Sequence, residues 1–477
     1  MNKNINPIIY LLLLTTVIIG GCKKDFLEEP KPASDLATPD VFASEVGVRS
    51  YFNGIYRRMR VQYGTTFDVF GIAHVNMARE VKGMDVVLPA GASAWFGFDY
   101  THDNREPGFR RTSFTWSFFY DFINQANNVI EGVTNSATIA DAAKARLTAE
   151  ARAMRAWCYF ELIREFAHAY SENPNGPGVP IYTTPTTGAT KGNPRSSIAE
   201  VYALIVDDLE FAVSNIPTTR QLKDVINKDV VQGLRARVYL EMGNWQKAKE
   251  AAQAAKAFAP LNAANWNTPF TSIDKSEVIW GFPQSADQTI FYGTPSAYWG
   301  YTGTVIGGFY IDSIFVNSFS ATDIRKTTFV RSGQTDFRRW NSRKFGTTTN
   351  FTDHFIMMRV PEMWLIEAEA KARLGEGDAG DILFAVQKSR DPNAVASGNT
   401  GQALINEILY ERRKELYGEI GVGFLDIKRL GLPLVRGVGH PILYRFNIPG
   451  HSNRFTLKIP QTEIDANESL TEADQNP

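Results

Sequence analysis

Apolar residues recur at helical spacing over much of the chain. Between Leu147 and Tyr170 they fall on nearly every face of the expected helix, which predicts a helix buried on two sides. Further helices are expected over 198–216 and from 405 to about 419. Ser197 is placed to cap the first of these, with Glu200 three residues later as its capping-box partner. The pattern predicts a mainly α-helical protein.

Two segments combine a helix, a glycine-containing turn and a second helix. In the first, Tyr239 and Gly243 stand at the tyrosine and turn positions of a tetratricopeptide unit. Ala248 and Ala255 occupy the small-residue positions of its second helix, where they let two antiparallel helices pack closely. A second, weaker unit spans Val360–Arg390. Such units without a strict period indicate a degenerate helical solenoid.

Two regions, about 85–115 and 261–350, lack the helical pattern and are rich in small and aromatic residues. The stretch FYGTPSAYWGY, Phe291–Tyr301, holds five aromatic rings without helical or strand periodicity. EVIWGFP, residues 277–283, predicts a short strand with Trp280 in the core. Long connections without regular structure are usually functional, so both regions are expected to build a binding surface.

The N-terminal residues are typical of a secretory signal. One lysine precedes an apolar run, Ile8–Ile19, which is too short to span a bilayer and is followed by two glycines and Cys22. Small residues directly before a cysteine resemble the lipobox of bacterial lipoproteins. We expect residues 1–21 to be a lipoprotein signal peptide, Cys22 to be lipidated, and 22–44 to form a charged, proline-rich tether. The alternative is an ordinary signal peptide with a chance cysteine.

Composition and charge exclude several classes of protein. With 44% hydrophobic residues the chain can bury a large core. Fifty basic and fifty-one acidic residues leave no basic surplus, so a nucleic-acid partner is not expected. The other cysteine, Cys158, lies in an apolar helical stretch and is expected to be a buried structural thiol.

Catalytic motifs are not found in the sequence. Six histidines are scattered without an i,i+4 pair, and there is no HExxH, GxSxG or phosphate-binding glycine loop. The sequence therefore supports neither a metal site nor a cofactor, and no catalytic residue is assigned. We expect a protein that is not an enzyme.

Several segments, taken in chain order, resemble a known family. They are CKKDFLEEP, EARAMRAWCYFELIREFAHAY, SSIAEVYALIVDDLEFAV, LRARVYLEMGNWQKAKEAA, MRVPEMWLIEAEAKARLG, ILYERRKELYGEIGVGFLDIKRLG and IPQTEIDANESLTEADQNP. Together they resemble the SusD/RagB family of outer-membrane nutrient-binding lipoproteins over nearly the whole chain.

The resemblance implies a single SusD-like domain over 45–477, with a tetratricopeptide-type helical solenoid as scaffold. Long irregular loops and a few short strands would form its ligand face. The scaffold would lie mainly in 45–80, 116–260 and 355–430, and the ligand face in about 85–115 and 261–350.

The resemblance also implies a function. The protein would be anchored by lipid in the cell outer membrane, facing the exterior, and would bind oligosaccharides without catalysis. It would deliver them to a SusC-like TonB-dependent porin for import. Three alternatives stay open: a peptide-binding, RagB-like member of the same family, an enzyme, and a tetratricopeptide adaptor that binds another protein.

Sugar chemistry selects candidate residues within the loop regions. A pyranose ring packs its C–H face on a flat aromatic ring, while its hydroxyls need amide, carboxylate or guanidinium partners. The expected aromatic platforms are Trp95, Tyr100, Tyr292, Tyr298, Trp299 and Tyr301. Further candidates are Arg79, Asp99, Asn104 and Trp340. We expect Tyr298, Trp299 and Tyr301 to face outward, and Phe291, Tyr51, Phe52 and Tyr56 to lie inside.

Overall fold

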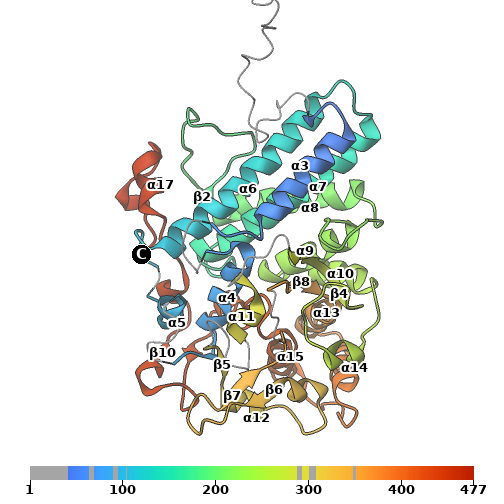
Figure 1. Cartoon of the computed structure of the whole chain (residues 1–477), viewed down its shortest axis with the longest axis vertical. Coiled ribbons are helices and arrows are strands. Elements are labelled where there is room, and N and C mark those ends of the chain that lie inside the picture. Colours follow the sequence, from blue (N-terminus) through green and yellow to red (C-terminus); the bar gives the residue numbers. More distant parts are fainter. Residues whose placement is uncertain are drawn as a thin grey trace, which may run out of the picture.

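Long helices lie side by side at one end of the computed structural model (Figure 1). They are α3 (Glu45–Arg58), α6 (Arg110–Asn135), α7 (Asp141–Phe166) and α8 (Ile198–Asn215). The structure describes residues 41–63, 69–89, 95–103, 105–286, 293–299, 308–346 and 351–477.

The predicted local features of these helices are confirmed. α7 is buried on nearly every face, and Cys158 on it is fully buried, which raises the pKa of its thiol. The Ser197 side chain accepts a hydrogen bond from the Glu200 amide, and Glu200 in turn accepts one from the Ser197 amide. On α3, Phe52 and Tyr56 are buried as expected, whereas Tyr51 is half-buried.

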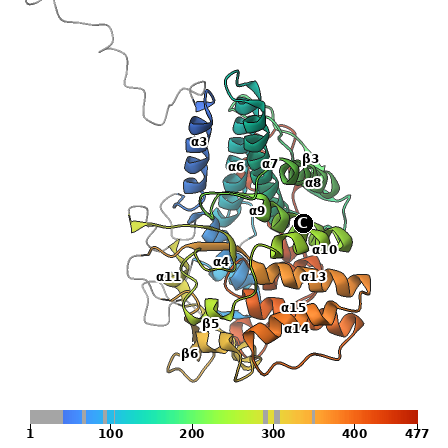
Figure 2. The same cartoon turned by 90° about the vertical axis from the view of Figure 1, so that its right-hand side faces the viewer.

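Stacked helix pairs continue the scaffold (Figure 2). They are α9 (Lys228–Glu241) with α10 (Trp245–Lys256), and α13 (Val360–Leu374) with α14 (Ala379–Arg390), followed by α15 (Gly401–Leu416). Gly243 ends α9 with φ +70°, in the left-handed region that favours glycine. Ala248 and Ala255 of α10 are fully buried, which confirms the first predicted helix–turn–helix unit. The second predicted unit is confirmed by α13 and α14, which pack together over Val360–Arg390.

Shorter helices and paired strands complete the fold around these helices. The helices are α4 (Gly71–Lys82), α5 (Gly97–Thr101), α11 (Pro295–Trp299), α12 (Ser313–Asn317), α16 (Val422–Arg429) and α17 (Gln461–Ala466). The strands form antiparallel pairs: β1 (Val86–Val87) with β5 (Tyr310–Ile311), β2 (Pro177–Pro180) with β3 (Arg195–Ser197), β4 (Val278–Phe282) with β8 (Phe355–Arg359), β6 (Phe329–Arg331) with β7 (Trp340–Ser342), and β9 (Leu434–Val435) with β10 (Asn447–Ile448). The strand predicted around Trp280 is confirmed as β4, and Trp280 is fully buried.

Two main hydrophobic clusters stabilise this arrangement. The larger lies among α3, α6–α10 and α13, and the second lies beneath the loop-rich regions.

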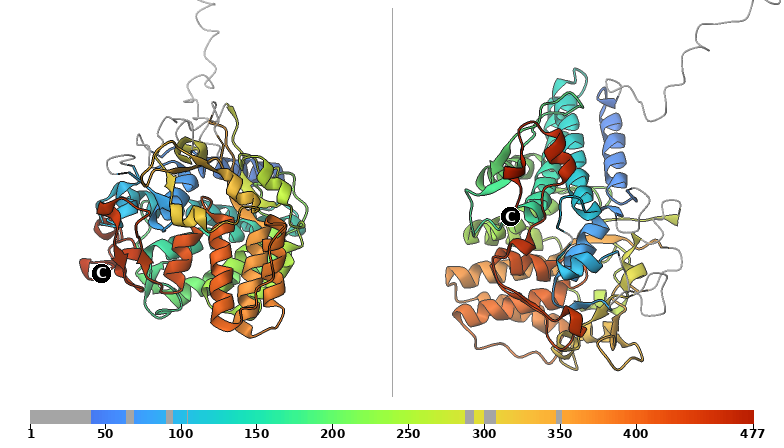
Figure 3. Two further views of the ribbon diagram at one scale, coloured as in Figure 1. Left: turned by 90° about the horizontal axis from the view of Figure 1, so that it is seen from below. Right: turned by 90° about the vertical axis from the view of Figure 1, so that its left-hand side faces the viewer.

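Residues 456–476 return to the long helices, where the Leu457 amide donates to the Glu165 carbonyl at 2.8 Å. Figure 3 shows this red segment, which includes α17, running beside α6. None of the helices built from the described residues is long and apolar enough to cross a bilayer.

Candidate functional site

The two loop-rich regions meet in the structure. β1 from the first pairs with β5 from the second, with Val86 opposite Ile311 and Val87 opposite Tyr310. Next to this pair, the Asp312 amide donates to the Asp85 carbonyl at 2.9 Å. Segments far apart in the chain therefore build one face, which we call the loop face.

An aromatic cluster lies under the loop face. Phe96 contacts Tyr298 and Phe309 at ring-centroid distances of 5.2 and 5.7 Å, and Trp299 contacts Phe309 at 5.3 Å. Tyr298 and Trp299 have no exposed surface. The prediction that these two rings face outward is wrong, because they lie on a short helix, α11, whose rings pack into the second hydrophobic cluster.

Tyr100 and Asp99 are also buried rather than presented to a ligand. The Tyr100 hydroxyl lies 2.5 Å from Nδ1 of His440, and the Arg436 guanidinium stacks 3.9 Å from the centre of the Tyr100 ring. Asp99 accepts from Nε of Arg111 at 3.3 Å. Tyr100 and Asp99 on α5 therefore hold loop segments against the core. The prediction that they contact a ligand is wrong.

Arg79 forms buried ion pairs in the scaffold. Its guanidinium contacts Glu161 and Glu165 on α7, each at 2.5 Å. Burial alone would raise the pKa of Glu161, but Arg164 and Arg79 outweigh it and lower that pKa to about 2. The prediction of Arg79 as a ligand residue is wrong, because its guanidinium is buried and paired with two carboxylates of α7.

One predicted platform, Trp95, and one of the further candidates, Trp340, remain at the surface. Trp95 and Trp340 are half-buried, with the guanidinium groups of Arg110 and Arg331 at 5.9 and 4.4 Å from their ring centres. The other candidates, Tyr292, Tyr301 and Asn104, lie outside the described residues, as do Phe291, Cys22 and the signal peptide.

A groove of about 680 Å³ opens in the later loop region. We call it the loop groove. Its walls are η2 (Ala263–Asn267), η5 (Ile324–Thr328) and the residues after β7. It is lined by Trp266, Asn267, Thr268, Pro269, Ile324, Thr327, Thr328, Arg343, Lys344 and Gly346.

The lining of the loop groove combines a tryptophan with polar groups. Asn267, Thr327 and Arg343 are exposed at its rim and offer an amide, a hydroxyl and a guanidinium. Trp266 is 3% exposed, and its Nε1–H has no hydrogen-bond acceptor among the described residues. Such a groove can satisfy ligand hydroxyls through several directed hydrogen bonds. Sequence reasoning missed this set, although WNT at 266–268 lies in the region it selected.

Lys344 forms the floor of the loop groove. Its ammonium donates to Glu419 and to the Tyr417 carbonyl, each at 2.6 Å, and lies 5.0 Å from the centre of the Trp266 ring. Burial outweighs the attraction of Glu419 and lowers the pKa of Lys344 to about 8. The floor is therefore positively charged at neutral pH but already paired within the protein.

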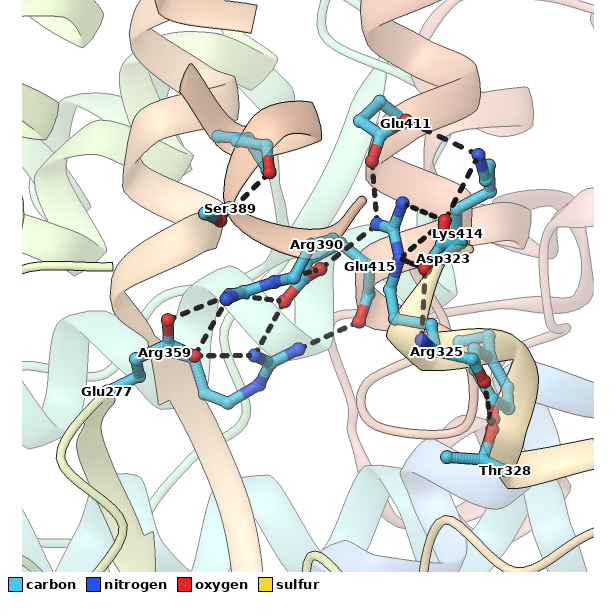
Figure 4. A network of polar contacts seen from close by, with 12 residues as sticks. Glu277, Asp323, Arg325, Thr328, Arg359, Ser389, Arg390, Glu411, Lys414 and Glu415 are labelled. Atoms are coloured by element: carbon cyan, nitrogen blue, oxygen red, sulfur yellow. Dashed lines mark hydrogen bonds and ion pairs between the residues drawn. The ribbon is translucent and has the colours of Figure 1, made fainter. Parts of the chain in front are cut away.

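A buried network of arginines and carboxylates holds the groove against the scaffold (Figure 4). Arg325 on η5 contacts Asp323 at 2.8 Å, and Glu411 and Glu415 on α15 at 2.6 and 3.1 Å. Figure 4 also shows Arg359 and Arg390 converging on Glu277 and Glu415, at 2.8 to 3.6 Å.

Glu415 is the central acceptor of this network and is fully buried. Burial favours its neutral form, but the guanidinium groups of Arg390, Arg359 and Arg325 outweigh burial and hold its pKa well below the usual value. The carboxylate therefore stays ionised. Because Arg325 lies between Ile324 and Thr327, the network also fixes one wall of the loop groove.

Comparison with known proteins agrees with this fold. Residues 25–240 match a family model described as starch-binding proteins that associate with the outer membrane, and residues 320–477 match the model of the SusD family. The chain belongs to the SusD family. A SusD-like protein of Bacteroides ovatus is 24% identical over 238 residues, which span 49% of this chain and 39% of that protein.

Solved structures of SusD-like proteins share the fold. A SusD-like carbohydrate-binding protein from Bacteroides vulgatus is 27% identical, with a TM-score of 0.81 over 90% of this chain and 97% of the other. Surface glycan-binding protein A from Bacteroides thetaiotaomicron, solved in complex with laminarihexaose, is 18% identical, with a TM-score of 0.71 over 91% of this chain and 99% of the other. At 18% identity the second likeness shows the fold alone.

Proposed function

We propose that this SusD-family protein is a non-catalytic glycan-binding lipoprotein on the outside of the outer membrane. It captures oligosaccharides at the loop face and delivers them to a SusC-like TonB-dependent porin for import. The main support is the loop groove, whose lining combines the Trp266 indole with hydroxyl, amide and guanidinium groups on a SusD fold. The carbohydrate-binding and laminarihexaose-bound neighbours favour the same ligand class.

The groove chemistry suits a chain of sugar rings. Asn267 and Thr327 can donate and accept at the same rim, as sugar hydroxyls require, and Arg343 adds donors. We propose Trp95 and Trp340 as further platforms on the loop face, because each retains accessible surface. Tyr292, Tyr301 and Asn104 stay in the proposal as candidates.

Titration calorimetry of the chain from Lys23 onward tests this function. The ligands are plant, fungal and host polysaccharides, with a peptide digest beside them. Two matched variants locate the site: Thr327→Trp places an indole in the groove, and Thr335→Trp makes the same change at an exposed position outside its lining.

The proposal predicts saturable binding of one glycan to the wild type and to Thr335→Trp, and at least tenfold weaker binding to Thr327→Trp. Binding of the digest alone would assign the protein to the peptide-binding branch of the family. If no polysaccharide binds, the proposed function is wrong.

A further inference from the structure

A second hollow lies at the opposite end of the molecule from the loop groove. It is bounded by α6, the 181–190 loop and α17, and has a volume of about 250 Å³. In Figure 1, α6 and α17 lie in the upper part, whereas β6 and β7 beside the loop groove lie at the bottom. We call this hollow the helix cleft.

Three aromatic rings line the helix cleft in series. The ring centres of Trp116 and Tyr120 are 4.8 Å apart, and those of Tyr120 and Tyr182 are 5.9 Å apart. Trp116 is nearly buried, while Tyr120 and Tyr182 are half-buried and retain surface toward solvent. The Tyr120 hydroxyl donates to the Pro180 carbonyl at 2.7 Å, and the Tyr182 hydroxyl accepts from the Asn193 amide at 3.0 Å. Both rings are thus held in fixed orientations.

The loop that forms one wall is tied down at several points. Asn124 donates to the Thr186 carbonyl at 3.1 Å and accepts from the Thr186 amide at 2.7 Å. Asn127, one turn away on α6, donates to the carbonyls of Tyr182 and Thr184 at 3.1 and 3.0 Å. Because this wall is already ordered, binding a ligand does not require the loop to lose further conformational entropy.

Polar groups complete the cleft and remain able to bond a ligand. Glu463 on α17 accepts from Nε1 of Trp116 at 3.2 Å and from the Asn467 amide group at 2.9 Å. A carboxylate has about four acceptor sites, so it has capacity for ligand hydroxyls. Ser117, Thr187 and Thr190 place exposed hydroxyls at the rim.

From these features we infer that the helix cleft binds one neutral sugar ring, either free or at the end of a glycan chain. The aromatic wall accepts the C–H face of a pyranose, and Glu463 with the rim hydroxyls accepts and donates hydrogen bonds to its hydroxyl groups. The volume is below the roughly 300–1,000 Å³ of pockets for drug-sized ligands, which fits a single ring better than an oligosaccharide. An acidic sugar is disfavoured because its carboxylate would be repelled by Glu463. Among the described residues that line the cleft, Glu463 carries a charge and no basic residue balances it.

This inference does not rest on the proposed function, because the helix cleft and the loop groove share no lining residue. Saturation-transfer NMR tests it on the chain from Lys23 onward. The probes are the methyl glycosides of glucose, galactose, mannose and xylose, with glucuronate as the acidic counterpart. Disaccharides of the sugar that binds distinguish a site for free sugar from one for a chain end: saturation confined to the non-reducing ring indicates a chain end.

Matched tryptophan substitutions on α6 locate the binding. Ser117→Trp fills the cleft from its exposed rim, and Glu131→Trp makes a comparable change at an exposed position of the same helix. We expect at least one neutral glycoside to bind the wild type and Glu131→Trp, binding to be lost in Ser117→Trp, and binding to be about tenfold weaker in Glu463→Gln. Thermal unfolding checks that each variant is folded.

Several results would overturn the inference. They are the failure of every neutral glycoside to bind the wild type, a preference for glucuronate, or binding that survives Ser117→Trp. The loop-groove variant Thr327→Trp must keep the glycoside signal. If Thr327→Trp loses the signal and Ser117→Trp keeps it, the glycoside binds the loop groove, so the proposed function stands while the helix-cleft site is wrong.

Discussion

The imidazole of His440 is held in its neutral form inside the protein. Nδ1 contacts the Tyr100 hydroxyl and Nε2 lies 2.9 Å from the Met84 carbonyl. Burial, followed by the nearby Arg436 charge, lowers the pKa of His440 to about 3. The unfolded chain binds a proton near pH 6.5, whereas the folded protein does not, so the contribution of His440 to stability is complete above pH 6.5 and falls as the pH falls toward 3.

His440→Gln is therefore expected to reduce the acid sensitivity of the fold. The wild type should lose about 2 kcal/mol through this residue between pH 7 and pH 5, and the variant should not. Urea unfolding at both pH values measures the difference. His451→Gln, at a side chain that is 55% exposed, serves as the control and should keep the wild-type dependence. Equal pH dependence in His440→Gln and the wild type would contradict the assignment.

Truncation of Trp299 should mainly lower stability, whereas truncation of Trp340 should mainly weaken glycan binding. Trp299 is fully buried, so Trp299→Ala leaves a large cavity and is expected to cost about 3–5 kcal/mol of unfolding free energy. Trp340 is half-buried on β7, so Trp340→Ala should cost about 1 kcal/mol or less while weakening glycan binding. Urea unfolding and calorimetry on both variants test this. A Trp299→Ala variant with wild-type stability would show that the ring is not a core residue.

Residue types indicated where a ligand face would form but not which rings point out. The small residues around Tyr298 and Trp299 are typical of a loop, yet Pro295–Trp299 form the short helix α11, and both rings are buried. Arg79 and Asp99 have side chains suited to a ligand, but their partners lie on other segments of the chain. A single sequence does not reveal these pairings, because ion pairs depend on tertiary contacts.

Among the elements, η5 depends on α15 for its position. Glu415→Ala removes the carboxylate shared by Arg325, Arg359 and Arg390 and leaves buried guanidinium groups without their central partner. We expect a loss of about 3–5 kcal/mol in urea unfolding, together with weaker glycan binding at the loop groove.

A surface ion pair provides the control for this prediction. Asp336 pairs with Arg338 at 2.8 Å, with side-chain exposures of 40% and 39%. Asp336→Ala should change stability by less than about 1 kcal/mol. If both substitutions had the same small effect, the buried network would not be what fixes the wall of the groove.

Helices were the most predictable elements. Apolar periodicity located α7 and α8, and the Ser197 capping box marked the first turn of α8 within one residue. The pairing of β1 with β5 was not predictable, because strands of two residues carry almost no pattern and their partners are distant in the chain. The sequence thus predicted the scaffold well and the loop face only as two regions.

For the whole molecule, the lipid anchor gives a direct prediction. We expect Cys22→Ser to move the protein from the membrane fraction to the soluble fraction, because acyl chains supply most of the membrane affinity of an anchored protein. The packed contacts described here begin at residue 41, so thermal unfolding should stay unchanged. Cell fractionation and circular dichroism measure the two outcomes. Membrane association that persists in Cys22→Ser would contradict lipidation at this residue.

The return of residues 456–476 to the long helices has a consequence for biogenesis. The Asn476 side chain donates to the Phe166 carbonyl across a sequence separation of 310 residues, and Glu463 accepts from Trp116. While a ribosome is still making the chain, α6 and α7 lack these partners, and contacts of such long separation form slowly. These two helices cannot complete their native contacts until residues 456–476 have been made, which delays completion of the fold during synthesis. A polypeptide held open in this way suits export before folding.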